Sequence, residues 1–417
     1  MKSFLPLIRS EWRLPLFGFA MTFGSSLGQT YFIGLFSGEV RADLGLSHGQ
    51  FGGIYSAATL ASAALLLWTG SLIDRMDLSR YASLVTLGLA AACAVMAASS
   101  GALTLFIAVL GLRHLGQGLM GMTASTTVVR YLDRHPGKAN ALSGMGYSLS
   151  EALLPSLVIA TLAVMSWRQS WLFWGALSLL ILLPLTRVLL NGHEQRHRDY
   201  LAGLTGSSSS DRAATRRQWT RDEVIRDPAF YLFLPALMAQ PMLFTGFMFH
   251  QVHLVEEKAW SLPAWGGLYV LYALVSTGCK LLAGILVDRY SAVRLVPMVC
   301  LPLGLGLLCL ATSDSFVIAV LFMCLMGVSI GVYSTLSSPF YAEMYGTLHL
   351  GSIKSLTTAT MVLATAVTPA LMGALIDRDE TMEQMALAGV VYTLTASGLA
   401  HFASRLERPS RPTRPGV

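Results

Sequence analysis

Long apolar runs recur along the whole chain, and they limit the folds that it can adopt. Hydrophobic residues make up 54% of the sequence and charged residues only 12%, whereas about 25% of the residues of a soluble domain are charged. A helix that crosses a bilayer needs roughly 20 mostly apolar residues. We therefore expect an all-α membrane protein. Apolar runs between charged, Gly or Pro breaks predict twelve spans, at 15–37, 50–73, 81–99, 102–127, 140–166, 168–190, 229–255, 262–287, 292–312, 315–341, 351–375 and 384–405.

The distribution of Lys and Arg predicts the orientation of these spans. With the N-terminus in the cytoplasm, 23 of the 29 basic residues lie in or at the ends of cytoplasmic segments, and four lie in outer loops. Loops rich in Lys and Arg stay on the cytoplasmic side of a membrane. We therefore expect both termini in the cytoplasm. The net charge of +6 is then a topology signal and gives no reason to expect nucleic-acid binding.

One long polar loop divides the chain into two halves. Residues 191–228 are basic and low in complexity around Ser207–Ser210, and such a segment cannot bury a core. We expect a six-helix bundle over 1–190, a cytoplasmic linker over 191–228, a second bundle over 229–405 and a cytoplasmic tail over 406–417.

A charged motif occurs once in each predicted half. GSLIDRMDLSR at 70–80 and GILVDRYSAVR at 284–294 are 214 positions apart, as are Pro155 and Pro369. Each motif follows the second span of its half, so we expect two six-helix pseudo-repeats. The matching positions are Gly70, Asp74, Arg75 and Arg80 in the first copy, and Gly284, Asp288, Arg289 and Arg294 in the second.

Two such motifs in a chain with twelve predicted spans resemble the major facilitator superfamily. The resemblance covers residues 1–405 and implies transport by alternating access around a cavity between the two halves. In that reading the motifs are gating loops. Their Asp side chains accept hydrogen bonds from a neighbouring helix N-terminus, and their Arg side chains bridge to acidic groups or carbonyls. The alternative is that the Arg residues are ordinary cytoplasmic anchors.

A charge at membrane depth is costly unless it is paired or faces water, and four ionisable side chains of the predicted spans stand out as candidates. Lys280, Arg113, Glu151 and His250 are therefore candidate functional residues. Each has a structural alternative. Arg113 and Glu151 could pair between the spans 102–127 and 140–166. His250 could lie at the membrane interface, and Lys280 could extend its amine toward the cytoplasm. Two neutral residues of the first predicted span, 15–37, are Gln29 and Tyr31. They either line the cavity or pack between helices.

The position of Lys280 further resembles the bacterial monocarboxylate porter and oxalate/formate exchanger branch of the superfamily. Members of this branch often place a cation there to contact the substrate carboxylate, so Lys280 and then Arg113 are our candidate substrate contacts. LRHLGQGLMG at 112–121 supplies the helix 4 arginine one residue out of the usual register. Ser276 stands where proton-coupled relatives often carry Asp, which leaves Glu151 or His250 as candidate proton carriers.

These observations predict a secondary transporter of a small organic solute, a monocarboxylate or similar anion, in the bacterial inner membrane. A drug or amphiphile efflux transporter with the same fold is the alternative. A membrane-embedded enzyme or sensor is a remote one, since no GxSxG, HExxH or P-loop motif occurs. The five Cys lie in apolar segments without metal-ligand spacing. We expect no cofactor, no metal, no nucleic-acid partner, a co-transported proton as an option, and a monomer in the bilayer.

Overall fold

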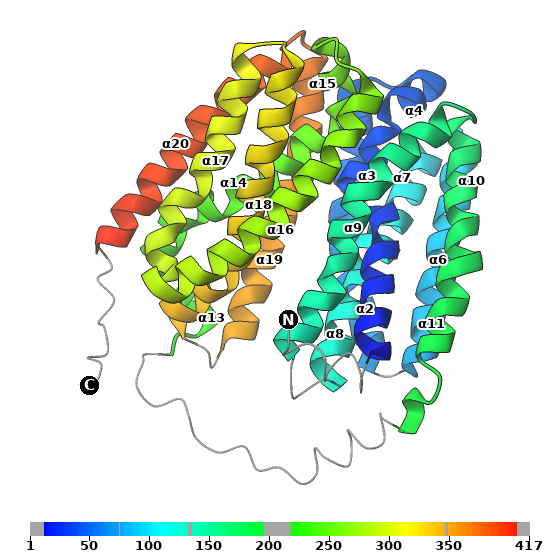
Figure 1. The fold of residues 1–417 in the computed structure, drawn as a ribbon, viewed down its shortest axis with the longest axis horizontal. Coiled ribbons are helices and arrows are strands. Elements are labelled where there is room, and N and C mark those ends of the chain that lie inside the picture. Colours follow the sequence, from blue (N-terminus) through cyan, green and yellow to red (C-terminus); the bar gives the residue numbers. More distant parts are fainter. Residues whose placement is uncertain (1–11, 75, 132–135, 196–217, 347–348, 407–417) are drawn as a thin grey trace. The chain divides into compact units, whose positions relative to one another are not determined.

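The structure is a computed structural model that describes residues 12–74, 76–131, 136–195, 218–346 and 349–406. These residues form helices and connecting turns without any strand (Figure 1). The elements before the long loop are α2 (Arg13–Gly24), η1 (Ser25–Gly28), α3 (Thr30–Leu35), α4 (Ser37–Leu44), α5 (His48–Thr69), η2 (Gly70–Asp74), α6 (Leu78–Ala97), α7 (Ala102–Gly111), η3 (Leu112–Met120), α8 (Gly121–Tyr131), α9 (Pro136–Leu162), α10 (Trp167–Leu177), η4 (Ser178–Leu182) and α11 (Leu183–Leu189). Those after it are α13 (Arg221–Ile225), α14 (Pro228–Phe249), α15 (Gln251–Glu257), α16 (Leu262–Tyr290), α17 (Ala292–Thr312), α18 (Phe316–Tyr345), α19 (Leu350–Ile376) and α20 (Met382–Leu406).

The prediction of an all-α membrane protein is confirmed in its coarse form. Ten helices in the described part of the chain are long and apolar enough to cross a membrane. Helices also occupy the ranges predicted for the first two spans, but the first is a series of shorter segments, α2, η1 and α3. The count of twelve spans and the cytoplasmic position of both termini stay predictions.

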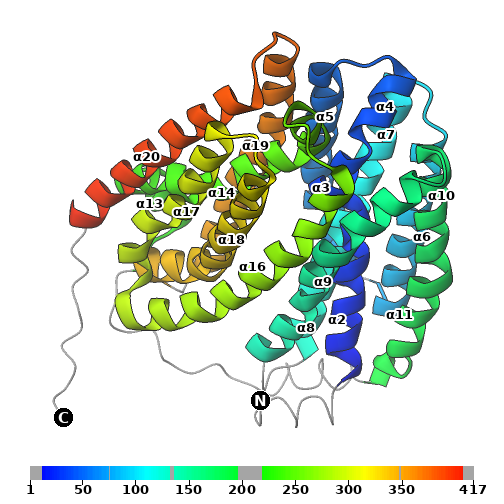
Figure 2. The same ribbon diagram turned by 45° about the horizontal axis from the view of Figure 1, so that its top comes forward.

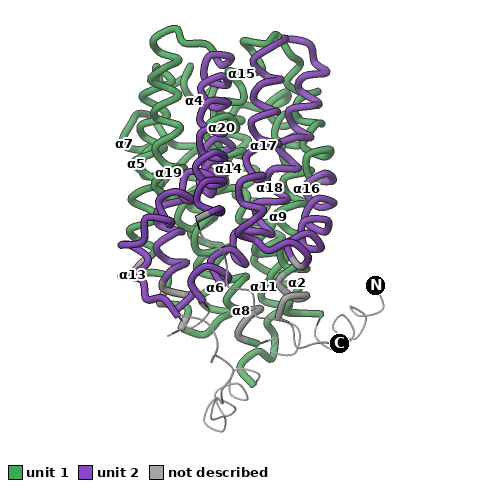
Figure 3. Tube along the Cα trace, turned by 90° about the vertical axis from the view of Figure 1, so that its left-hand side faces the viewer, with its two compact units in different colours: residues 1–211, 245–273, 362–381 green, residues 212–244, 274–361, 382–417 purple. Residues whose placement is uncertain are grey.

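The chain divides into two compact units, shown separately coloured in Figure 3. Unit 1 contains residues 1–211, 245–273 and 362–381, and unit 2 contains residues 212–244, 274–361 and 382–417. Unit 1 therefore combines the first half of the chain with one end each of α14, α16 and α19. This division positions the candidate site, because it brings segments from both halves of the sequence into one compact unit.

Within unit 1, small residues allow the helices to approach closely. A Cβ added at Gly175 of α10 would lie 2.9 Å from Cβ of Cys93 on α6, and α6 lies beside α10 and α11 in both ribbon views (Figures 1 and 2). A Cβ at Gly266 of α16 would lie 2.6 Å from Cδ1 of Ile159 on α9. Small residues at helix contacts permit dense packing in lipid, where apolar burial alone does not drive association.

Unit 2 is held together around α17, which packs against α18 and α20. Ser397 of α20 donates a 2.5 Å hydrogen bond to the carbonyl of Pro297, a proline inside α17. The carboxylate of Glu343 accepts hydrogen bonds from the Ser291 hydroxyl and, at 2.8 Å, from the Ala292 amide. Glu343 of α18 thus caps the N-terminus of α17, where negative charge is stabilising.

Candidate functional site

The first helix is interrupted at Gln29, in the middle of the predicted span 15–37. Gln29 has extended backbone angles, φ −82° and ψ 151°, between η1 and α3, and its side chain is half-buried. An interrupted helix leaves backbone groups that must find other partners inside a membrane. The break therefore creates acceptors in the interior of unit 1, and the carbonyl of Gly28 is one of them.

Arg113 provides the partner for this break. Its Nη1 donates to the carbonyl oxygen of Gly28 at 3.1 Å and to Oγ1 of Thr30 at 3.4 Å. Its guanidinium lies over the ring of Tyr55, 5.1 Å from the centroid. Arg113 is only 3% exposed and, among the described residues, has no carboxylate within ion-pair distance. The site therefore holds a buried positive charge that only neutral groups surround.

A π-helical segment, η3, presents Arg113 to the break. A Cβ at Gly28 would lie 2.1 Å from the carbonyl oxygen of Leu112, and one at Gly116 would lie 2.9 Å from Cα of Gly28. No side chain fits at Gly28 or Gly116, so these glycines allow η1 and η3 to approach closely enough for Arg113 to reach the break. A π-helical turn within a longer helix is frequent at functional sites.

Tyr31 and Glu151 belong to the same region of unit 1. Tyr31 is 3% exposed, and its hydroxyl donates to Oγ of Ser150 at 3.5 Å. Ser26 donates to the same Oγ at 2.5 Å. Glu151 follows Ser150 on α9 and is half-buried. The Arg113 hydrogen bonds go to Gly28 and Thr30, and a pairing of Arg113 with Glu151 stays a prediction.

Gln251 at the start of α15 makes a hydrogen-bond network that sequence reasoning missed. Its Nε2 donates to the carbonyls of Tyr31 at 2.8 Å and Met248 at 2.9 Å. Its Oε1 accepts from Nε1 of Trp265 at 3.0 Å and from the hydroxyl of Tyr269 at 2.7 Å. All amide hydrogen-bonding positions are used at a residue that is 0% exposed. A single uncharged Gln gives no local pattern from which this could be inferred.

His250, which precedes Gln251, belongs to a second group of contacts, where the N-terminus of α5 meets α19. His250 is 3% exposed, and its Nε2 bonds the carbonyl oxygen of Pro369 at 2.9 Å. Asp377, which follows α19, accepts from the backbone amides of His48 at 3.0 Å and Gly49 at 2.9 Å. Sequence reasoning also missed Asp377, because its partners lie more than 300 residues away in the chain.

The surroundings of this contact lower the pKa values of both His48 and Asp377. His48 precedes the predicted span 50–73. Burial lowers the pKa of His48 to about 3, and Arg41, His253 and His250 act in the same direction against Asp377. Burial opposes ionisation of Asp377, but hydrogen bonds from Ser47 and from the amides of Gly49 and His48 lower its pKa overall. The contact therefore favours an ionised Asp377 and a neutral His48.

Lys280, the predicted substrate contact, lies in unit 2 on α16. It is half-buried and shares a helix face with Ser276 and Ala283, which are 1% and 3% exposed. The opposite face carries Leu281 and Ile285, which are 72% and 66% exposed and suit a lipid contact. The Lys280 ammonium makes no ion pair or hydrogen bond with another described residue.

The backbone around Lys280 is packed tightly against α18. A Cβ at Gly331 would lie 2.7 Å from the carbonyl oxygen of Ser276 and 3.2 Å from the amide nitrogen of Lys280. Thr335 donates to the Lys280 carbonyl at 3.4 Å. The backbone of Lys280 is therefore held in place by contacts within its own unit, and its role as a substrate contact stays a prediction.

The predicted gating loops are described only in part. Gly70 begins η2, and Arg80, Arg289 and Arg294 are exposed; Asp77 caps α6 by accepting from the Arg80 amide at 3.0 Å. Gly284 lies inside α16. Arg75 and the side chains of Asp74 and Asp288 lie outside the described residues, so the gating role of these loops stays a prediction.

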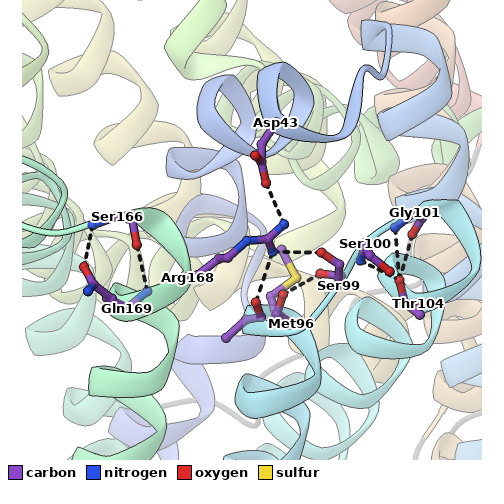
Figure 4. A network of polar contacts seen from close by, with 10 residues as sticks. Asp43, Met96, Ser99, Ser100, Gly101, Thr104, Ser166, Arg168 and Gln169 are labelled. Carbon is purple, nitrogen blue, oxygen red and sulfur yellow. Dashed lines mark hydrogen bonds and ion pairs between the residues drawn. The ribbon is translucent and has the colours of Figure 1, made fainter.

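Arg168, at the start of α10, has a clear structural role in unit 1. It donates to the carbonyls of Ala97 at 3.0 Å and Ser99 at 2.8 Å, and to the carboxylate of Asp43 at 2.6 Å (Figure 4). It joins α10 to α4 and to the turn after α6. Among the residues that the structure describes, no group of three or more His, Cys, Asp or Glu side chains is arranged to hold a metal ion.

Helices of this length and composition indicate a polytopic membrane protein, and comparison with known families makes this specific. The model of the Major Facilitator Superfamily matches residues 18–369. The chain belongs to the Major Facilitator Superfamily, as the repeated motifs predicted.

Individual relatives are distant. The chain is 24% identical over 256 residues to the hexuronate transporter of Escherichia coli K12, an alignment over 56% of this chain and 57% of that protein. It is 25% identical over 245 residues to an uncharacterised 38 kDa protein of Thermoproteus tenax, over 58% and 57% of the two chains. The alignments thus span a little more than half the length of these relatives, and they do not single out the monocarboxylate branch.

Solved structures share the fold over nearly the whole chain. A bacterial homologue of the human lysosomal transporter Spinster, inward-facing and unoccupied, matches with a TM-score of 0.69 and 14% identity over 95% of this chain and 98% of its own. The nucleoside transporter NupG matches with the same TM-score, identity and coverage. Both are transporters of the same fold, and neither identity is high enough to transfer a substrate.

Proposed function

We propose that this protein transports a small organic anion, a monocarboxylate in the broad sense that includes sugar acids, by alternating access. The observation that carries the proposal is the pair of basic side chains in predicted spans, Arg113 and Lys280, neither of which has a carboxylate partner among the described residues. A charge held at membrane depth without a counter-ion is costly. An anionic substrate supplies the missing charge.

The distant similarity to a hexuronate transporter supports the same class of substrate, because a hexuronate is a carboxylate anion. We assign Lys280 as the primary counter-charge, since this residue is half-buried and its ammonium has no ion-pair or hydrogen-bond partner among the described residues. Arg113 is the second cation, and its position at the helix 1 break makes Gln29 and Tyr31 proposed neighbours of the transported solute. Glu151 and His250 remain proposed proton carriers.

The test is uptake into proteoliposomes of radiolabelled glucuronate, lactate, pyruvate, formate and oxalate, with and without an inward proton gradient. We expect saturable uptake of at least one acid, and a loss of about tenfold or more in Lys280→Gln, since truncating one member of a buried charge pair costs about 2–5 kcal/mol. A stimulation by the gradient would identify proton coupling.

A matched variant is Lys354→Gln, which removes the same charge from a lysine whose Nζ already donates to Ser338 at 2.7 Å. This variant should retain uptake. If no acid accumulates while amphiphilic dyes are extruded, the protein is an efflux transporter and Lys280 is not an anion contact.

A further inference from the structure

Three histidines from two distant parts of the chain meet in unit 1, and we call this group the histidine contact. Its members are His48 at the start of α5, His250 before α15, and His253 within α15. The ring centroids of His48 and His253 are 4.5 Å apart, and those of His48 and His250 are 6.0 Å apart. All three belong to the same compact unit, so these distances lie within one body.

The histidine contact lies where helices from the two halves of the sequence are joined. Asp377 accepts from the Ser47 hydroxyl at 2.6 Å, and from the amides of His48 and Gly49. A Cβ at Gly52 of α5 would lie 2.3 Å from the carbonyl oxygen of Pro369, the same oxygen that His250 bonds. The backbones of α5 and α19 are therefore in direct contact, and separating them requires breaking these bonds.

The charged groups around the histidine contact come from every element that packs there. Arg41 of α4 is the fixed positive charge, and its influence lowers the proton affinity of His48. The carboxylates are Glu256 and Glu257 on α15 and Asp377 after α19. Glu257 lies 3.4 Å from Nε2 of His253, whereas Asp377 already accepts three hydrogen bonds. The His48 imidazole is thus nearest to other imidazoles and to Arg41, and it is left without a free carboxylate.

We propose that the histidine contact is a proton-binding site, and that its protonation opens the junction between α5, α15 and α19. In the closed arrangement the His48 and His253 rings meet edge to face, the His250 ring is tilted toward His48, and the charge of Arg41 acts on His48. A second or third positive charge at 4.5–6.0 Å is unfavourable there, and separation into water relieves it. The inference rests on this contact alone and does not depend on the proposed substrate.

The direction of the effect follows from linkage. A histidine in water has a pKa near 6.5, and in the closed contact the pKa of His48 lies well below that value. The open state therefore binds more protons. The closed state is favoured above about pH 6.5, and it is lost as the pH falls below that value, by up to about tenfold per pH unit for each histidine that gains a proton.

Hydrogen–deuterium exchange on the purified native chain tests the proposal. Exchange of peptides covering 45–55 and 369–380 would be measured at pH 7.5 and pH 5.5 and corrected for the intrinsic pH dependence of amide exchange. We expect corrected exchange of these peptides to rise by about tenfold at the lower pH, while a peptide from α17 in unit 2 does not change.

Two variants make the result specific. In His48→Gln with His253→Gln, the extra exchange at pH 5.5 should disappear. Asp377→Ala should expose the 45–55 peptide at both pH values because it removes both acceptor oxygens of the cap. Should the double variant not fold, His253→Gln alone must reduce the pH effect. Equal pH dependence in native and variant chains, or no change at pH 5.5 in the native chain, would overturn the proposal.

Discussion

Arg113 combines a structural role with a proposed role in transport. Its guanidinium holds the Gly28 carbonyl at the helix 1 break and lies over Tyr55, so removing it leaves a buried acceptor unpaired. Its charge, however, is not used by these neutral partners. The structural and electrostatic roles can therefore be separated by substitutions that keep one and remove the other.

We expect Arg113→Lys to retain part of the uptake activity and Arg113→Gln to lose it, by about tenfold or more, because only the lysine keeps a positive charge near helix 1. Initial uptake rates, normalised to the amount of folded protein in the membrane, measure this. Equal losses in both variants would indicate that the geometry of the guanidinium, and not its charge, is what transport requires.

We expect the titration of Asp377 to affect the stability of the protein at a lower pH than the titration of the histidines. Hydrogen bonds from Ser47, His48 and Gly49 lower the pKa of Asp377 below its ordinary value of 3.8, so its contribution is present above that value and is lost as the pH falls below it. Asp377→Asn should lower the thermal unfolding temperature at pH 7 and make its decline below about pH 4 smaller than in the native chain. An unchanged unfolding temperature at pH 7 would show that the cap contributes nothing.

The contact between helices α5 and α19 can be tested with two neighbouring glycines of α5, Gly52 and Gly53, of which only Gly52 faces α19. A Cβ at Gly52 would lie 2.3 Å from the Pro369 carbonyl oxygen, whereas at Gly53 nothing lies within 4 Å. We expect Gly52→Ala to destabilise the protein by about 1–3 kcal/mol through overpacking, and Gly53→Ala to be neutral or slightly stabilising. Thermal unfolding of the two variants in detergent decides this, and equal unfolding temperatures would contradict the close approach.

The Gln251 network makes a similar prediction for α15. Gln251→Leu keeps the volume but removes the acceptor of the Trp265 Nε1 and leaves the Tyr269 hydroxyl with only the Met248 sulfur, at 3.2 Å. Each unpaired buried group costs about 1–3 kcal/mol, so amide exchange across 251–257 should increase strongly. Gln169→Leu, which alters only an exposed helix cap, is the control and should leave that segment protected. Unchanged exchange across 251–257 in Gln251→Leu would argue against the network.

The same elements show what the sequence could and could not predict. Apolar runs predicted where the helices lie because lipid imposes length and composition on each span separately. The break at Gln29 was not predicted, since it depends on Arg113, which lies more than 80 residues away. The Asp377 cap and the Gln251 network were missed for the same reason. Interactions between distant segments leave no local pattern in a single sequence.

For the whole molecule, family membership and fold agree with the repeated motifs at 70–80 and 284–294 that first indicated them. Alternating access in this superfamily requires contacts that form in one state and break in another. The contacts of Asp377, His250 and Gln251 are suited to this, because they join segments from both halves of the sequence within unit 1. Lys280 lies in unit 2, has no ion-pair partner among the residues that the structure describes, and is the proposed substrate contact.

The most direct test of that assignment compares a transported acid with its neutral amide, for example glucuronate with glucuronamide, in the native chain and in Lys280→Gln. Initial uptake rates of the four combinations form a double-mutant cycle between the side chain and the substrate charge. We predict that the native chain prefers the acid by about tenfold or more, and that Lys280→Gln loses this preference. The same preference in both chains would contradict a role for Lys280 as the counter-charge of an anionic substrate.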